Sequence, residues 1–320
     1  MLAAEHSKLP PVSPPPPLSA IDLCRLMRET SGAGARGDLP GLDRLLCHDP
    51  ARAAVEVQAG ARWHALSALI GADFMAGTIG ASVAANRPGP DGRPVIAHVQ
   101  ALTLATADGH LQRVRRDRSP ELFSLAIGGF GAFGTFYSIT LDLDSLARAA
   151  AACIPGGQAD GPAITGDATR FEVELLLPPA AETSAQREVR ALLEEHRHVP
   201  EFVQARRVCP ESESFLRWAR RDYTALRIAF RSRATLGAVV SAAQLRGRLI
   251  GLAIRAGGSF MPDALPYASR AQIETCYPMF PAFLAEKRRL DPAGRILNTW
   301  YRETCRAWRG ESCRVRWLPD

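Results

Sequence analysis

The stretch from residue 78 to residue 143 constrains this 320-residue chain more than any other, because small residues, turns and glycines follow one another there in a distinctive order. Thr78-Ile79-Gly80-Ala81 opens a series of small residues that ends at Asn86, which lets backbone approach a neighbour or a ligand closely. A glycine- and proline-rich loop, typical of turns, follows at residues 88–94. The segment therefore predicts a unit built on close backbone contacts.

The second half of this stretch alternates strand and turn signals. Residues 99–106 and 111–114 are separated by Ala107-Asp108-Gly109, which predicts a β-hairpin. Ser119-Pro120-Glu121 then provides a cap, a first-turn proline and an early carboxylate for a short helix over 122–126. A run with glycines at 128, 129, 131 and 134 leads into a predicted strand over 135–143.

The glycine run alone leaves two interpretations open. It lacks the strand-then-helix order of a dinucleotide-binding Rossmann turn and the Gly-Lys-Ser/Thr ending of a nucleotide-triphosphate loop. It can be a tight turn in which backbone packs on backbone, or part of a ligand site.

Elsewhere the periodicity predicts an α+β chain whose second half is a sheet covered by helices on one face. A linker rich in Ala, Gly and Pro, residues 149–169, separates the two halves. The other predicted helices are 21–27, 61–70, 184–196, 236–256, 269–276 and 281–290, and the other predicted strands are 54–58, 170–177, 224–230 and 259–261.

Composition narrows the function classes. A net charge of +6 comes from arginines scattered through the chain, without a basic tract interleaved with aromatics, so we expect no nucleic-acid partner. We expect no membrane span, because no apolar run approaches the roughly 20 residues that a span requires. The seven cysteines form no C-x-x-C pair, so no zinc site is predicted. No basic-then-apolar leader is visible, and we expect a cytoplasmic protein.

Taken together, these motifs resemble the FAD-linked oxidases of the vanillyl-alcohol-oxidase family, which carry a PCMH-type FAD-binding domain. The resemblance rests on VEVQAGARWHAL at 55–66, TIGASVAAN at 78–86, LTLATADG at 102–109 and PELFSLAIGGFGAFG at 120–134. It extends to YPMFPAFLAEKRRLDPAGRILNTWY at 277–301, which is similar to the C-terminal tail of sugar-lactone and alditol oxidases.

The chain departs from the family pattern in several places. Ala81 replaces a second glycine, and Arg87-Pro88-Gly89 replaces a His-Gly tail. The N-terminal loop that cradles the FAD pyrophosphate is shortened, with Gly32, Gly34, Gly37 and Arg36 as a remnant or simply as a linker. No histidine or cysteine stands where the family attaches flavin covalently, and none follows the segment 257–260, where members often have a histidine.

The resemblance implies a two-subdomain FAD-binding domain at 20–148, after a proline-rich arm at 1–19. An α/β substrate-cap domain with an antiparallel sheet follows at 170–266, and a C-terminal segment at 267–320 returns to the flavin. The implied activity is oxidation of a hydroxyl-bearing carbon of a sugar lactone or polyol, with non-covalent FAD, a small-molecule substrate and an electron acceptor. The implied catalytic residues are Lys287 and Tyr301. The implied cofactor-binding residues are Thr78, Ile79, Gly80, Asn86, Gly128, Gly129, Gly131, Gly134 and Asn298.

The departures also support an alternative, a degenerate homologue or scaffold of the same fold that binds no flavin and is inactive. The oligomeric state is not predicted.

Overall fold

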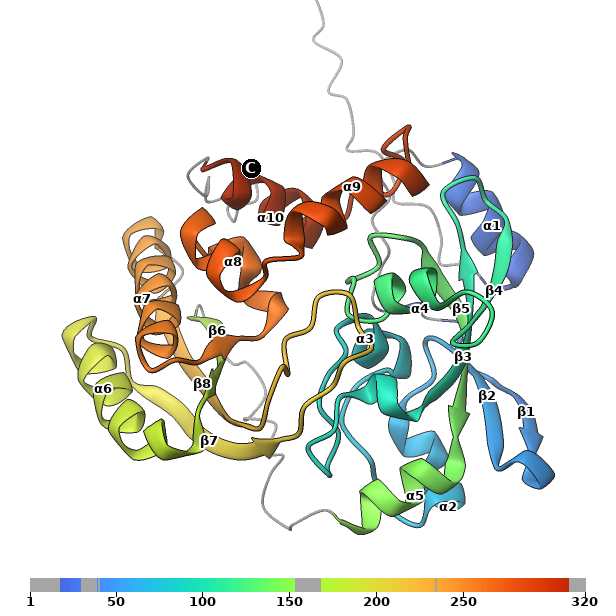
Figure 1. Ribbon diagram of the computed structural model, residues 1–320, viewed down its shortest axis with the longest axis horizontal. Coiled ribbons are helices and arrows are strands. Elements are labelled where there is room, and N and C mark those ends of the chain that lie inside the picture. The colour runs from blue at the N-terminus through green and yellow to red at the C-terminus, as the bar shows by residue number, and fades with distance from the viewer. Residues whose placement is uncertain (1–17, 30–38, 40, 153–167, 234, 311–320) are drawn as a thin grey trace, which may run out of the picture.

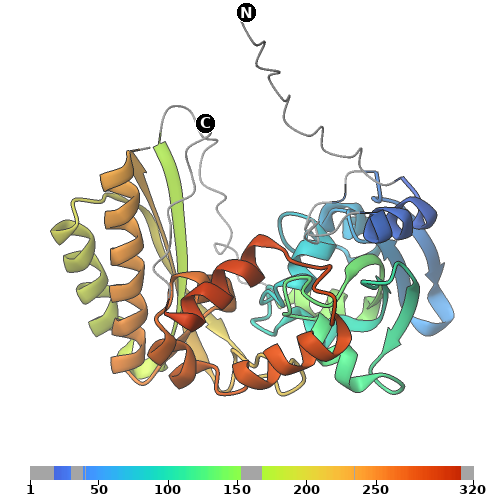
Figure 2. The same ribbon diagram turned by 90° about the horizontal axis from the view of Figure 1, so that it is seen from above.

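The computed structural model describes residues 18–29, 39, 41–152, 168–233 and 235–310. Helices and two antiparallel sheets form two lobes that lie side by side, the first drawn in blue to green and the second in yellow to orange (Figures 1 and 2). The predicted α+β class and the antiparallel sheet of the second half are therefore confirmed.

The first lobe is built on a five-stranded sheet of order β1-β2-β5-β3-β4. Its strands are β1 (Leu45–Asp49), β2 (Ala54–Gln58), β3 (Val99–Ala105), β4 (Leu111–Arg115) and β5 (Thr135–Asp142). The predicted hairpin is confirmed, with Leu102 opposite Val114 in the β3–β4 pair. Its helices are α1 (Ala20–Glu29), α2 (Ser67–Ile70), α3 (Ile79–Ala84), α4 (Pro120–Ala126) and α5 (Leu143–Ala151).

Helix α5 corrects the prediction that a linker begins at residue 149. The Asp142 side chain accepts a hydrogen bond from Ser145 N at 2.8 Å and so caps the helix. Leu146 and Ala149 are buried against the first-lobe core. The alanines of this segment therefore extend a helix, and the rest of the predicted linker, residues 153–167, lies outside the described residues.

The second lobe carries a four-stranded sheet of order β7-β8-β6-β9, with helices α6 and α7 on one face (Figure 1). Its strands are β6 (Ala168–Leu177), β7 (Pro200–Val208), β8 (Tyr223–Arg233) and β9 (Ser259–Phe260), and its helices are α6 (Glu182–Glu195) and α7 (Leu236–Arg255). Strand β7 was not predicted, because no residue before Val208 in it is fully buried and its apolar residues do not alternate strictly.

Three helices follow the second sheet: α8 (Arg270–Cys276), α9 (Phe280–Leu290) and α10 (Thr299–Arg309). Ser269 and Gln272 form a capping box at the start of α8, as the predicted Ser269 cap required. Helix α10 was not predicted. It is capped by the preceding residue, Asn298, whose side chain accepts a hydrogen bond from Tyr301 N at 2.8 Å.

The core of each lobe includes residues from segments that lie outside that lobe's own sheet and helices. Leu125, Ala132 and Phe133, from the segment that holds the glycine run, pack in the core of the second lobe. Ile296, from the C-terminal segment, packs in the core of the first lobe. This arrangement fixes the glycine run and the C-terminal segment at the boundary between the lobes.

The proline-rich arm up to residue 17 and the glycines at 32, 34 and 37 also lie outside the described residues. Among the helices that are described, none combines the length and the apolar character that crossing a membrane requires.

Candidate functional site: a cavity between the lobes

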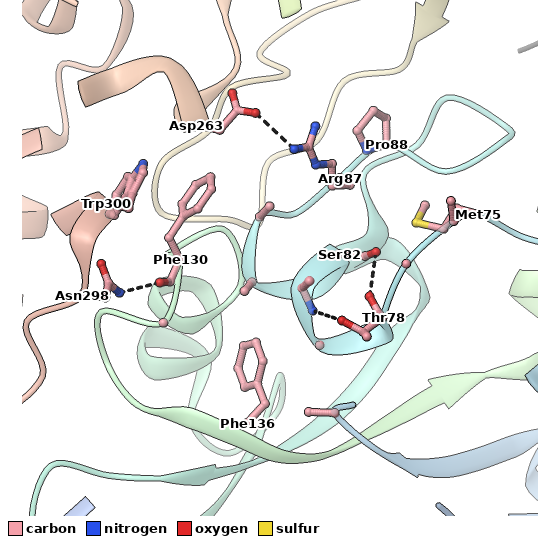
Figure 3. Close-up of a pocket in the computed structure, with 18 of the residues that line it drawn as sticks. Met75, Thr78, Ser82, Arg87, Pro88, Phe130, Phe136, Asp263, Asn298 and Trp300 are labelled. Atoms are coloured by element: carbon pink, nitrogen blue, oxygen red, sulfur yellow. Dashed lines mark hydrogen bonds and ion pairs between the residues drawn. The ribbon is translucent and has the colours of Figure 1, made fainter. Parts of the chain in front are cut away.

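A cavity of about 1230 Å³ lies where the two lobes meet. Its wall combines the small-residue segment 75–88, the glycine run 130–136, the open face of the second sheet, and the start of α10. In Figure 3, Met75 and Thr78 lie at one end and Asn298 and Trp300 at the opposite end. Two glycine-bearing segments, around Gly80 and around Gly131, thus line the same cavity.

The small-residue wall is the start of α3. Thr78 caps the helix, its hydroxyl accepting from Ala81 N at 3.3 Å. Gly80 N donates to Ala59 O at 2.8 Å, and a Cβ atom on Gly80 would lie only 2.6 Å from that oxygen. Glycine is required here because the residue that follows strand β2 and helix α3 approach each other backbone to backbone, which leaves a wall with little side-chain bulk.

The opposite end is aromatic. Phe130 stacks on Trp300 with ring centroids 4.4 Å apart (Figure 3). The Phe130 backbone has φ +52°, and its carbonyl accepts a hydrogen bond from Asn298 Nδ2 at 2.7 Å. Trp300 Nε1 donates to Pro262 O at 2.9 Å. The Asn298 and Trp300 side chains therefore join the first lobe, α10 and the second lobe at one point.

The second sheet contributes a polar wall. Glu174 and Arg206 pair at 2.6 Å, and Glu172 pairs with Arg227. Arg87, from the first lobe, reaches Asp263 at 3.2 Å in the 3₁₀ helix η5 (Pro262–Tyr267).

Burial alone would raise the pKa of the Glu174 carboxyl, but Arg206 and Arg87 hold that pKa below its ordinary value. Burial raises the pKa of Asp263, with Glu174 adding to the rise and Arg87 opposing it. The two carboxylates that share Arg87 therefore titrate differently, and Asp263 is the more easily protonated.

Two arginines of the cavity wall are exposed and make no ion pair with any residue in the described ranges. Arg62 precedes the 3₁₀ helix η2 (Trp63–Leu66) and its backbone pairs with Thr78, which fixes it beside the small-residue wall. Arg302 lies on α10, near Trp300. As far as the described residues go, both guanidinium groups are free to bind an anion.

The structure brings together five of the nine predicted cofactor-binding residues, and their cofactor role stays a prediction. Those that line the cavity are Thr78, Gly80, Gly131, Gly134 and Asn298. The four that do not line it are Ile79, Asn86, Gly128 and Gly129.

These four have structural surroundings instead. Ile79 is fully buried in the first-lobe core, and Asn86 Oδ1 accepts from Ile96 N at 3.0 Å. Gly128 has φ +78°, and a Cβ atom on Gly129 would lie 2.1 Å from Leu125 O. The first two glycines of the run therefore make the turn, and the later ones form the cavity wall.

The predicted catalytic pair is not part of the cavity wall. Lys287 is 2% exposed and its amino group pairs with the Asp291 carboxylate. Its Nζ atom lies 5.7 Å from the centre of the Tyr301 ring. Neither Lys287 nor Tyr301 lines the cavity. The contacts that Lys287 makes are those of a buried ion pair.

Other wall residues were missed as site residues: Phe130, Gln204, Arg206, Arg227 and Asp263. Gln204 and Arg206 lie on the unpredicted strand β7. Phe130 could have been identified as a site residue from the sequence, since it is a large aromatic residue between glycines. Asp263 lies in the segment after residues 257–260. In the sequence, that segment was notable only because it lacks the histidine that the family often has there.

The titratable side chains of the wall limit its chemistry. Among the described residues that line the cavity there is no histidine, lysine, tyrosine or cysteine. The carboxylates among these described wall residues are Asp263 and Glu172, and Glu172 is paired with Arg227.

Comparisons of the chain with models of known protein families and with curated proteins find no match.

Proposed function

We propose that this protein is an FAD-dependent oxidoreductase of the PCMH-type FAD-binding class, which binds the cofactor non-covalently in the cavity between its lobes. The single observation that carries the proposal is the shared cavity. Two segments about fifty residues apart in sequence, around Thr78 and around Gly131, form walls of one cavity, together with Asn298 from the C-terminal segment. The sequence resemblance to FAD-linked oxidases gives these same segments to the flavin.

The residues present fit a flavin dinucleotide. The volume of about 1230 Å³ exceeds the 300–1,000 Å³ or so of most small-molecule sites, as a long ligand requires. Small residues at the α3 end let a ligand approach the backbone. Arg62, which forms no ion pair within the described part of the chain, suits a diphosphate there. The Phe130–Trp300 pair offers an aromatic surface at the opposite end.

In the proposed reaction the flavin would accept a hydride from a hydroxyl-bearing carbon of a polyol or sugar lactone, and the proton of that hydroxyl group would leave to solvent. The protein's residues position that carbon. The second sheet provides a polar wall of paired arginines and carboxylates, and Trp300 and Asn298 hold the aromatic end in place. A second small molecule would reoxidise the flavin.

One observation favours a second candidate, an inactive relative of the same fold. The described cavity wall holds no histidine, lysine or tyrosine, and Lys287 is in a buried ion pair. A protein of this kind would retain the cavity without oxidising a substrate.

Titration of the purified chain with FAD, followed by flavin fluorescence, tests the proposal. We expect micromolar or tighter binding. Ala81 lines the cavity, and Ala81→Trp should fill part of it and weaken FAD binding by about tenfold or more. Ala68→Trp is the matched control, because Ala68 is exposed on α2 and does not line the cavity.

Absence of FAD binding, or equal affinity in the Ala81 variant and the control, would contradict the proposal. Binding that is followed by no flavin reduction across a panel of polyols and sugar lactones would favour the inactive relative. Gly129→Trp does not test FAD binding, because a side chain at position 129 would collide with the Leu125 carbonyl and disrupt the fold.

A further inference from the structure

The cavity between the lobes is lined by more positive than negative side chains. Among its described lining residues, five are arginines and two are carboxylates. Three of these arginines already have carboxylate partners, in the pairs Arg227–Glu172, Arg206–Glu174 and Arg87–Asp263. The excess of positive charge therefore comes from the two other arginines, Arg62 and Arg302.

Arg62 and Arg302 belong to opposite ends of the cavity. The backbone of Arg62 pairs with that of Thr78, whereas Arg302 lies on α10, two residues after Trp300. Thr78 and Trp300 lie towards opposite ends of the cavity in Figure 3. Both arginines are exposed, and neither makes an ion pair in the described part of the chain. Satisfying both of them therefore takes two separate anionic groups.

The backbone from which the Arg302 side chain extends is held by both lobes. Arg302 N donates to Asn298 O at 3.1 Å, and the Asn298 side chain caps α10 and donates to Phe130 O in the first lobe. Trp300 Nε1 donates to Pro262 O at 2.9 Å, which joins the same turn to the second lobe. Arg302 therefore has a defined place at this end of the cavity.

A ligand that fills the cavity displaces water from the wall. An arginine that loses water without gaining an acceptor raises the free energy of the complex. The diphosphate of FAD, which the proposed function places near Arg62, supplies an anion at that end only. The end at which Arg302 lies is left for an anionic group of the substrate.

We propose that Arg302 binds a carboxylate group of the substrate, so that the preferred substrate is a polyol that carries a carboxylate, a sugar acid. In naming the substrate, the inference rests on the proposed function. The planar guanidinium can donate two parallel hydrogen bonds to a carboxylate. It also balances the single charge of that group, whereas a phosphate monoester carries about −1.5 to −2 charges. Oxidation at a hydroxyl-bearing carbon leaves the carboxylate unchanged.

The test is the affinity of the full-length chain for xylonate and for xylitol, which have the same carbon chain and differ in one carboxylate. Ligand-observed NMR titration measures both, without FAD and with saturating FAD under anaerobic conditions, which limit any oxidation to one turnover. At low ionic strength we expect xylonate to bind about tenfold or more tightly than xylitol. The preference should fall as salt is added, because Arg302 is exposed.

Variants of the two arginines separate the two ends of the cavity. Arg302→Gln should weaken xylonate binding by about tenfold and leave xylitol binding unchanged, whereas Arg302→Lys keeps the charge and should retain part of the preference. Arg62→Gln should weaken FAD binding and leave the preference for xylonate. Arg118→Gln is the matched control, since Arg118 is also an exposed arginine and does not line the cavity.

Equal affinity for the two probes, a preference that persists in Arg302→Gln, or acetate binding as tight as that of xylonate would overturn the sugar-acid subsite. A larger loss of FAD affinity in Arg302→Gln than in Arg62→Gln would also overturn it, because the diphosphate would then lie at Arg302. A chain that prefers xylonate through Arg302 but binds no FAD would retain the subsite and refute the flavin proposal.

Discussion

Lys287 matches the C-terminal motif of the sugar-lactone and alditol oxidases, but its pairing with Asp291 gives it different surroundings from those that the motif suggests. Both side chains are almost completely buried, and the Asp291 carboxylate also accepts hydrogen bonds from Arg295 N and Ile296 N at 2.9 Å each. Burial alone would raise the pKa of Asp291, but the bond from Lys287 and those backbone amides hold that pKa below its ordinary value. The pair therefore fixes the turn between α9 and α10.

Asp291→Asn tests this at the residue scale. It leaves Lys287 buried without a counter-charge, and we expect the free energy of unfolding at pH 7 to fall by about 3–5 kcal/mol. Because the folded-state pKa of Asp291 lies below its unfolded value of about 3.9, its contribution is complete above that pH. It is lost as the pH falls through the folded-state pKa.

Guanidinium unfolding between pH 2 and pH 7 measures both effects in the wild type and the variant. The variant should lose part of the acid dependence of stability while its affinity for FAD stays unchanged, since neither residue lines the cavity. A variant as stable as the wild type, or one that folds normally but binds FAD much more weakly, would contradict this assignment.

At the scale of the element, Asn298 serves both α10 and the glycine run. Its Oδ1 caps the helix and its Nδ2 donates to the Phe130 carbonyl. Asn298→Ala removes both bonds and should cost about 1–2 kcal/mol of stability. Asn298→Asp keeps a good cap but loses the donor, so it should retain most of the helix stability while weakening FAD binding severalfold. Chemical denaturation measures the loss of stability, and FAD titration measures the loss of affinity. Wild-type stability and wild-type FAD affinity in both variants would contradict these roles of Asn298.

The helices and strands that could be predicted are those whose own sequence shows a regular spacing of apolar residues or a helix-capping residue. Alternation located strand β2 at its observed bounds, and the turn at Asp108-Gly109 located the β3–β4 hairpin. Strand β7 was missed because it is half-exposed and its arginines Arg206 and Arg207 pair with Glu174 and Asp222. Helix α10 was missed because its apolar face is made of aromatic residues that pack on other elements, such as Trp300 on Phe130.

At the scale of the whole molecule, the cavity depends on how the lobes are joined. The sequence indicated that the segments around Gly80 and Gly131 belong together. It could not indicate that Asp263 and Gln204 would form the facing wall, because their positions depend on the Arg87–Asp263 pair and on the exchange of Phe133 and Ile296 between the cores. Local patterns do not encode such contacts between distant segments.

A crystal structure of the protein grown with saturating FAD would show directly where the cofactor binds. We expect density for the cofactor along the cavity, with its diphosphate near Arg62 and Thr78 and with Gly131 beside it. Well-ordered crystals in which that cavity holds only solvent, or in which the flavin binds elsewhere on the molecule, would contradict it.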